Sequence, residues 1–514
     1  MSTGASEPVD MLNIPHKGLL SISIMLATIM QVLDTTIANV ALPSMRGSLG
    51  ASQDQITWVL TSYIVASAIV TPVTGWLSDR FGLRQIFIIS AAGFVVTSMA
   101  CGMASSLNEM VAFRIAQGLF GACLVPLSQT VLLDINPRER HGQAMAVWGM
   151  GVMLGPIIGP TLGGWLTENW GWRYVFYVNL PVGLLALAGM FMFLPKTPPK
   201  VRRFDFFGFT MLAIAIGALQ MVLDRGQAQD WYQSTEIWLE TGLFVSGLWV
   251  FAIHIRNARD PFISLHVLKD TNLLTALALI ALVGAMVLGG SALLPSMLQD
   301  ILGYTASRSG LIMAPRGFGT MVAMMLYGRL SNRIDARAAI LLGLTLTAWS
   351  MLMMTRFSVD MGEGPIITSG IIQGFGLGLV FVPLSALAYA TLEARYRAEA
   401  AGLFSLVRNI GSSVGISLLS TVLAWNVAIN RTEMTAQITE SGPRLADMAE
   451  KTGFPHTVLV YLVNSEISLQ ASMIAYLDDF KLMMIVTFAL MPLVLLMRKP
   501  GGPKVTRVVV DAGH

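Results

Sequence analysis

Fourteen long apolar segments constrain what this chain can fold into more than any other feature. Each has roughly 20 residues or more, the length that an α-helix needs to cross the apolar core of a bilayer. Charged residues make up 12% of the chain, about half of their share in soluble domains, so a soluble enzyme is excluded. We therefore predict an all-α integral membrane protein. Its predicted spans are 18–42, 55–77, 85–104, 107–133, 143–167, 173–194, 205–224, 236–256, 272–298, 308–330, 336–356, 364–391, 399–424 and 477–498.

The basic residues predict the orientation of these spans. When the N-terminus is placed in the cytoplasm, 21 of the 33 Lys and Arg residues fall on the inner side and nine on the outer side. Inner loops of membrane proteins carry an excess of positive charge. Both termini are therefore expected in the cytoplasm, and the longest loop, 425–475, is expected outside.

The chain also repeats itself, which predicts two pseudosymmetric halves. GWLSDRFGLR from Gly75 matches GRLSNRIDAR from Gly328, and QGLFGACLVPLS from Gln117 resembles QGFGLGLVFVPLS from Gln373, at offsets of 253 and 256. The simplest organisation is six helices, two inserted helices and six more, which is typical of transporters with a central cavity. The predicted parts are a tail 1–17, a first half 18–194, inserted helices 195–260, a second half 261–498 with the loop 425–475, and a tail 499–514.

Two charged residues inside predicted helices are the first candidates for a functional site. Asp34 in helix 1 lies roughly 13 Å from the outer end of its span, and Arg114 in helix 4 roughly 9 Å. Because an unpaired charge is costly inside a bilayer, we expect the two side chains to pair. A proton on Asp34 would break such a pair and make a proton-coupled switch, whereas a permanent ion pair would only fix the helices. At the repeat offsets these positions hold Met286 and Gly370, so the fold itself does not require the charges.

The loop after helix 2 is a candidate conformational latch on the inner side. Its arginines can bridge to the inner ends of neighbouring helices, for example to Asp134, while the outer side is open. The alternative is a basic loop that only sets topology. The predicted latch residues are Gly75, Asp79, Arg80, Arg84 and Asp134.

Helix 5 carries a face of small residues. Glycines recur every four residues, so a neighbouring helix can approach its backbone closely. Two prolines weaken its hydrogen-bond ladder, which allows either a hinge or tight static packing. The residues concerned are Gly151, Gly155, Pro156, Gly159, Pro160 and Gly163.

The remaining polar residues inside predicted helices are candidates for a substrate cavity. Each of them can also serve as a hydrogen-bonding contact between helices. The 32 methionines and 23 phenylalanines are consistent with an adaptable apolar pocket. The candidates are Gln31, Asn39, Gln117, Gln129, Asn179, Arg316, Gln373, Arg408 and Asn409.

Several segments together resemble one family. MQVLDTTIANVALP (30–43), GWLSDRFGLRQ (75–85), RIAQGLFGA (114–122) and GPIIGPTLGG (155–164) are similar to signatures of the 14-helix proton–drug antiporters of the major facilitator superfamily, the EmrB/QacA type. WRYVFYVNLPVG (172–183) and LDRGQAQDW (223–231) resemble further blocks of this branch. The resemblance covers essentially the whole chain, and helix 1 and the outer loop are most similar to EmrB.

The resemblance implies an activity and partners. It implies multidrug efflux from the bacterial inner membrane, with antibiotic resistance as a result, driven by the proton gradient and without a cofactor or metal. It links Arg114 to proton coupling and implies a periplasmic adaptor (EmrA-like) and an outer-membrane channel (TolC-like). Relatives that export dications carry an acid in helix 10, where this chain has Arg316. One acid against three arginines inside helices favours neutral, weakly acidic or amphiphilic anionic substrates.

Three alternatives to a multidrug exporter remain open. One is a dedicated proton-coupled exporter of a single endogenous lipid-like or siderophore-type metabolite. A second is a sensor or assembly subunit that keeps the fold without transporting, and a third is an importer. ATP-driven export is disfavoured because the sequence has no GxxxxGK[ST] motif, and no enzymatic activity is expected.

Overall fold

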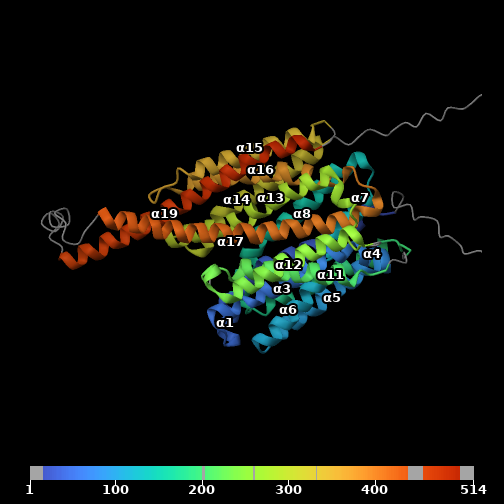
Figure 1. Ribbon diagram of the computed structural model, residues 1–514, viewed down its shortest axis with the longest axis horizontal. Helices are drawn as coiled ribbons and strands as arrows, with labels where there is room; N and C mark the ends of the chain where they lie inside the picture. Colours follow the sequence, from blue (N-terminus) through green and yellow to red (C-terminus); the bar gives the residue numbers. More distant parts are fainter. Residues whose placement is uncertain are drawn as a thin grey trace, which may run out of the picture.

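The computed structural model describes residues 15–198, 203–227, 229–258, 261–331, 333–437 and 455–497, and these residues form helices and no strand (Figure 1). Twelve of the described helices, counted across their short breaks, are long and apolar enough to cross a membrane. Two more, α13 (Thr271–Ser296) and α14 (Ala306–Leu330), take the places of the ninth and tenth predicted spans. The helices therefore agree with the predicted order of six, two and six.

The first half contains six crossings, of which three are interrupted by a short break. The predicted span 107–133, for example, is two helices because the α-helical pattern stops at residues 122–123. The elements are α1 (Lys17–Leu49), α2 (Gln53–Ile56), α3 (Trp58–Val70), η2 (Thr71–Val73), α4 (Thr74–Phe81), α5 (Leu83–Met103), α6 (Leu107–Gly121), α7 (Leu124–Asp134), α8 (His141–Asn169), α9 (Tyr174–Tyr177) and α10 (Asn179–Phe193).

The second half follows two inserted helices. A π-helical turn, η6, interrupts the outer end of its first crossing. Besides α13 and α14, the elements are the inserted α11 (Phe206–Arg225) and α12 (Thr235–Asn257), then η6 (Met297–Ile301), α15 (Ala336–Met354), α16 (Glu363–Ala390), α17 (Arg397–Gln437), α19 (His456–Leu490) and η8 (Met491–Leu496).

The two halves form two groups of helices that lie side by side (Figure 1). In this view α13 to α17 and α19 gather in the upper group, and α1, α3, α5 and α6 in the lower group. The groups meet where α8 packs against α14 and where α17 packs against α4 and α7. The inserted pair α11 and α12 joins the lower group, and α11 contacts both α3 and α17.

Glycines allow one helix pair in each half to pack closely. A Cβ atom on Gly155 of α8 would come 2.6 Å from Cγ1 of Val32 on α1, and one on Gly159 would overlap the Thr36 hydroxyl. In the second half, Cβ atoms on Gly411 and Gly415 of α17 would come 2.5 Å from the Cα atoms of Ala281 and Ala285 on α13. The glycines are 256 residues apart in the sequence, so the repeat extends to helix packing.

The predicted small-residue face of α8 is therefore a real contact surface, but the predicted hinge is not a break in this structure. Gly151 and Gly163 face α1 as Gly155 and Gly159 do, where added Cβ atoms would come within 3.0 Å of Met25 and Ile37 side chains. The helix α8 stays continuous over 29 residues through Pro156. The side chain of Pro160 lies outside the described residues.

The segment 425–475, predicted as an outer loop, is largely helical where it is described. Helix α17 continues to Gln437 and α19 begins at His456, so each runs beyond its predicted span. In Figure 1 the two helices extend further to the left than the other helices of the upper group. The polar residues of this segment gave no sign of these helical extensions, because an exposed helix does not require a continuous apolar stretch.

Candidate functional site

Asp34 and Arg114 form a fully buried ion pair. Both side chains are 0% exposed, and Nη1 of Arg114 lies 2.7 Å from Oδ2 of Asp34. The same Nη1 donates to Oε1 of Gln117 at 2.8 Å, and Nε donates to the carbonyl of Val59 at 2.9 Å. The expected pairing of helix 1 with helix 4 is thus present, and a carbonyl of α3 helps to orient the guanidinium.

The second oxygen of the Asp34 carboxylate is held by two amides. Gln117 of α6 donates to Oδ1 at 2.9 Å, and Asn179 at the start of α10 donates at 2.7 Å. The Asn179 amide also lies 2.9 Å from the hydroxyl of Ser98 on α5, which donates to the carbonyl of Phe176. Three helices, α1, α6 and α10, therefore meet at this carboxylate, and the predicted cavity residues Gln117 and Asn179 donate hydrogen bonds to it.

Aromatic rings surround the cation. The guanidinium carbon of Arg114 lies 4.3 Å from the ring centroid of Tyr63 and 5.8 Å from that of Phe176. A desolvated cation over an aromatic face gains roughly 2 kcal/mol or more. Among the described residues Nη2 of Arg114 has no hydrogen-bond partner. The arginine is therefore held by a carbonyl, an amide and two rings in addition to Asp34.

The second half builds the corresponding position without an acidic residue. Met286, which the repeat aligns with Asp34, accepts at its sulfur from the hydroxyl of Thr487 at 3.8 Å. Its carbonyl accepts from Nη2 of Arg316 at 3.4 Å. Gln373, the counterpart of Gln117, is 2% exposed and turns its amide toward the sulfur of Met351 at 3.7 Å. The charges at Asp34 and Arg114 are therefore an asymmetric addition to a symmetric fold.

The other predicted cavity residues are not all brought together. Gln129 accepts from the hydroxyl of Tyr389 at 3.1 Å and so links α7 to α16 of the other half. Gln31 lies one turn before Asp34 and its Oε1 has no partner among the described residues. Asn39 is exposed near the outer end of α1, and Asn409 is half-buried on α17. Gln373 lies inside its own half, away from the contact between the halves.

Two half-buried arginines in the second half have no acidic partner within the described chain. Arg316 on α14 reaches only the Met286 carbonyl, and Arg408 lies on α17 in the neighbourhood of the Tyr389 ring. Gly290 and Gly370 give Arg316 its space, because added Cβ atoms would come 3.1 Å from its Nη1 and 3.7 Å from its Cβ. Neither cation faces an acidic side chain in the part of the chain that the structure describes.

The two halves are joined at one end by a different pair from the one predicted. Asp134 at the end of α7 accepts from Nη1 of Arg397 at the start of α17, at 2.8 Å. It does not pair with the predicted arginines: Arg84 donates instead to the carbonyl of Phe191 at 2.7 Å, and Arg80 is exposed. Asp134 lies beside the other half, whereas Arg84 lies at the inner end of α10.

Gly75 of the predicted latch does face the other half. A Cβ at this position would come 2.9 Å from the Cα of Glu399, whose carboxylate accepts from the backbone N–H of Ser264. Asp79 is half-buried. Sequence reasoning missed Arg397 and Glu399, although the repeat offered a signal: RYR at 395–397 lies 257 residues after RER at 138–140.

Further contacts between the halves continue along α8 from its inner start. A Cβ on Gly142 would come 2.7 Å from the Cβ of Ser331, and one on Gly328 would come 2.7 Å from the Cβ of Ala146. The rings of Trp148 and Phe381 stack with centroids 5.9 Å apart. The halves are therefore in direct contact over the inner part of the molecule.

Comparison with known proteins agrees with this architecture. The family model described as Major Facilitator Superfamily matches residues 24–426. The chain is 35% identical to the fatty acid resistance protein FarB of Neisseria gonorrhoeae, covering 93% of this chain and 96% of FarB. It is 34% identical to the multidrug export protein EmrB of Escherichia coli K12, covering 84% and 85%. A crystal structure of the human organic anion transporter MFSD10 (TETRAN) has the same fold, with a TM-score of 0.61 at 16% identity over 93% of this chain and 100% of that one. The chain therefore belongs to the Major Facilitator Superfamily of transporters.

Proposed function

We propose that this chain is a proton-coupled multidrug efflux antiporter that exports lipophilic neutral, weakly acidic or amphiphilic compounds by alternating access. The observation that carries the proposal is the buried Asp34–Arg114 pair with its amide shell. An ionisable pair inside a membrane protein is costly and is commonly functional. The names of the relatives FarB and EmrB, which concern fatty acid resistance and multidrug export, agree with it.

The geometry supports a proton-driven step at Asp34. A proton on Oδ2 removes the charge that Arg114 neutralises, while the Val59 carbonyl, Gln117 and two rings still hold the guanidinium. The Asp34–Arg114 ion pair that links α1 to α6 is thereby weakened, while the guanidinium of Arg114 keeps its other partners. Because α1 is packed on the glycine face of α8, and α8 packs against α14, a shift of α1 has a direct path to the other half.

The charges support the proposed substrate class. Asp34 is neutralised by Arg114, and Arg316 and Arg408 of the other half face no acid within the described chain. A half-buried guanidinium without a carboxylate partner favours an anionic or weakly acidic head group over a dication. The apolar remainder of such a compound is suited to a methionine-rich helical interior. A dedicated exporter of one lipid-like or siderophore-type metabolite would use the same charges.

The contacts between the halves support a latch on the cytoplasmic side, with both termini in the cytoplasm. The pair Asp134–Arg397 and the contact of Gly75 with Glu399 join the inner ends of the two halves. Both sites follow the loops that carry the excess of positive charge. We assign this arrangement to a state that is closed toward the cytoplasm.

The outer parts of α17 and α19 support a contact with a periplasmic adaptor, which in turn would join an outer-membrane channel. Helix α17 has 41 residues, roughly 60 Å of helix, about twice the thickness of the apolar core of a bilayer. Large apolar side chains remain exposed toward the far ends of the two helices: Trp425, Ile429, Tyr461 and Leu462. Such side chains commonly mark protein interfaces.

Transport in proteoliposomes tests the function. Efflux of a lipophilic weak acid, a neutral amphiphile, a monocation and a dication is followed under an imposed pH gradient. We expect gradient-dependent movement of several compounds, lost in Asp34→Asn and Arg114→Ala and kept in the exposed control Asp360→Asn. Movement of a single compound class would favour the dedicated exporter. Undiminished transport by Asp34→Asn would make the ion pair structural and end the proposed mechanism.

A further inference from the structure

Asp479 on α19 is a buried carboxylate that the proposed mechanism does not use. Its side chain is 0% exposed, and neither carboxylate oxygen has a hydrogen-bond partner among the described residues. The other buried acids of the described residues differ: Asp34 is paired with Arg114, Glu240 lies 3.9 Å from Nη1 of Arg225, and Glu399 accepts from the Ser264 backbone. Burying an ionised carboxylate without a partner costs several kcal/mol. An ionised Asp479 would therefore be an uncompensated charge in this arrangement of the described residues.

The charged groups around Asp479 reinforce this conclusion. The neighbouring residue on the same helix is Asp478, a second acid, which supplies no positive charge to Asp479. The hydroxyl of Tyr476 and the carboxylate of Asp300 lie on the same side of α19, and α13 carries no charged residue. None of the other charged residues on the described elements that pack against α19 donates a hydrogen bond to Asp479. They are Arg337 on α15 and Arg397, Glu399, Arg408, Arg431 and Glu433 on α17, of which Arg431 bonds Asn464 of α19 instead.

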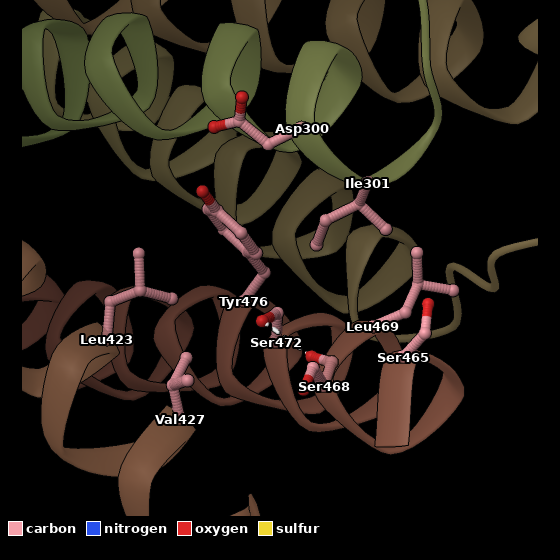
Figure 2. A pocket seen from close by; sticks show the side chains of 9 residues that line it. All are labelled: Asp300, Ile301, Leu423, Val427, Ser465, Ser468, Leu469, Ser472 and Tyr476. Carbon is pink, nitrogen blue, oxygen red and sulfur yellow. Dashed lines mark hydrogen bonds between the residues drawn. The ribbon is translucent and has the colours of Figure 1, made fainter. Parts of the chain in front are cut away.

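A pocket lined in part by hydroxyl groups reaches Tyr476, which lies one helical turn before Asp479 on α19. Its volume is about 370 Å³. Ser465, Ser468, Ser472 and Tyr476 line it from α19, and Asp300 of η6 lies opposite, with the Tyr476 ring rising toward that segment (Figure 2). The remaining lining residues are Ile301, Leu423, Val427 and Leu469.

The spacing of these hydroxyls connects the pocket with Asp479. Ser468, Ser472 and Tyr476 follow one another at four-residue steps, and Asp479 lies three residues further into the membrane. Residues three and four apart share one face of a helix, so the polar stripe ends at the buried carboxylate. The π-helical turn η6 places Asp300 across from this stripe, and such turns are frequent at functional sites.

We propose that Asp479 is a second proton-binding carboxylate, separate from Asp34, which is loaded and emptied from the outer side through this hydroxyl-lined pocket. Asp479 stays protonated as long as α19, α17 and η6 stay packed against one another. When water reaches the carboxyl through the pocket, the proton passes to water and the carboxylate ionises. A role in transport rests on the proposed function, whereas proton binding does not.

Infrared difference spectroscopy on the purified full-length protein tests proton binding without any transport. We expect a carbonyl band of a protonated carboxylic acid that appears and disappears reversibly with pH. The band should be lost in Asp479→Asn and kept in Asp478→Asn, the matched control one residue away, and in Asp34→Asn. If Asp479→Asn does not fold, Asp479→Glu should shift the band. A band unchanged by these substitutions, or one that never titrates, overturns the proposal.

The ratio of protons to substrate tests the role in coupling. In proteoliposomes with a transported weak acid, Asp479→Asn should lower the number of protons moved per substrate, while Asp478→Asn leaves it unchanged. An unchanged ratio in Asp479→Asn overturns the coupling role. Failure of the wild type to transport any compound would contradict the proposed function, and the infrared result would still decide whether Asp479 binds a proton.

Discussion

Arg397 at the start of α17 donates to Asp134 at the end of α7, at 2.8 Å, and this bond joins the two halves of the transporter at one end. The loops on this side carry the repeated basic motifs. The bond is partly exposed to water, with 9% of the Arg397 and 22% of the Asp134 side chain accessible, so it can break and reform during a cycle.

Breaking this bond should open the inner side. We expect Asp134→Asn or Arg397→Gln to increase several-fold the rate at which a maleimide modifies Ser331→Cys, because Ser331 is covered by α8 at Gly142. The native Cys101 and Cys123 are buried and give a low background. The exchange Asp134→Arg with Arg397→Asp should restore slow labelling. Equal rates in all variants would show that the bond does not hold the halves together.

Variants of Arg114 should distinguish the effect of its positive charge from the effect of its hydrogen-bonding geometry. Arg114→Lys keeps the positive charge, but a single ammonium cannot bond Val59, Asp34 and Gln117 in the geometry of the guanidinium. We expect Arg114→Lys to bind substrate and to lose proton release on substrate addition. Arg114→Ala leaves Asp34 buried and unpaired, which costs about 3–5 kcal/mol, and should lower the thermal unfolding midpoint in detergent. A fully coupled Arg114→Lys would contradict a geometric role of the guanidinium.

The glycine face of α8 should tolerate no side chain. Gly159→Ala places a Cβ against the Thr36 hydroxyl, and overpacking of this kind costs about 1–3 kcal/mol. We expect a lower thermal unfolding midpoint and slower transport. Gly164→Ala is the control on the same helix, because nothing lies within 4 Å of its added Cβ. Similar stability of the two variants would mean that α1 and α8 do not need their close contact.

Arg316 should set the preference for charged substrates. Arg316→Gln removes a cation that has no acidic partner within the described chain. A hydrogen bond to a charged group contributes about 1.5–3 kcal/mol, so we expect apparent affinity for a weak acid to fall roughly ten-fold or more. Affinity for a neutral amphiphile should stay the same. A parallel loss for both compounds would indicate that Arg316 supports the helix and does not contact the head group.

The sequence predicted the ion pair because a membrane leaves charges few ways to be neutralised. One acid and one arginine at similar depth had each other as the obvious partner, and amides were the remaining polar groups of the first half. The fold was predictable for a similar reason, since apolar length and the repeat constrain the helices strongly.

Contacts that depend on how a helix is rotated about its own axis could not be predicted from the sequence. Gln373 was expected in the cavity, but its face of α16 turns toward Met351 of the same half. Arg397 was expected only as an inner charge, because a loop prediction does not say which half lies opposite. Asp479 fell within the last predicted span, but its burial depends on how α19 packs against neighbouring helices.

The matched glycines of α8 and α17 also determine how far a local helix movement is transmitted through the molecule. A helix that contacts the backbone of its neighbour at several successive turns cannot slide or bend independently of it. We therefore expect α1 with α8, and α13 with α17, each to move as a rigid body. With 29 residues, α8 is about 43 Å long, and a tilt of roughly 10° about its centre displaces each end by about 4 Å. On the proposed mechanism, a change of one proton at Asp34, near the middle of α1, would then displace the far end of α8 by more than the length of a hydrogen bond.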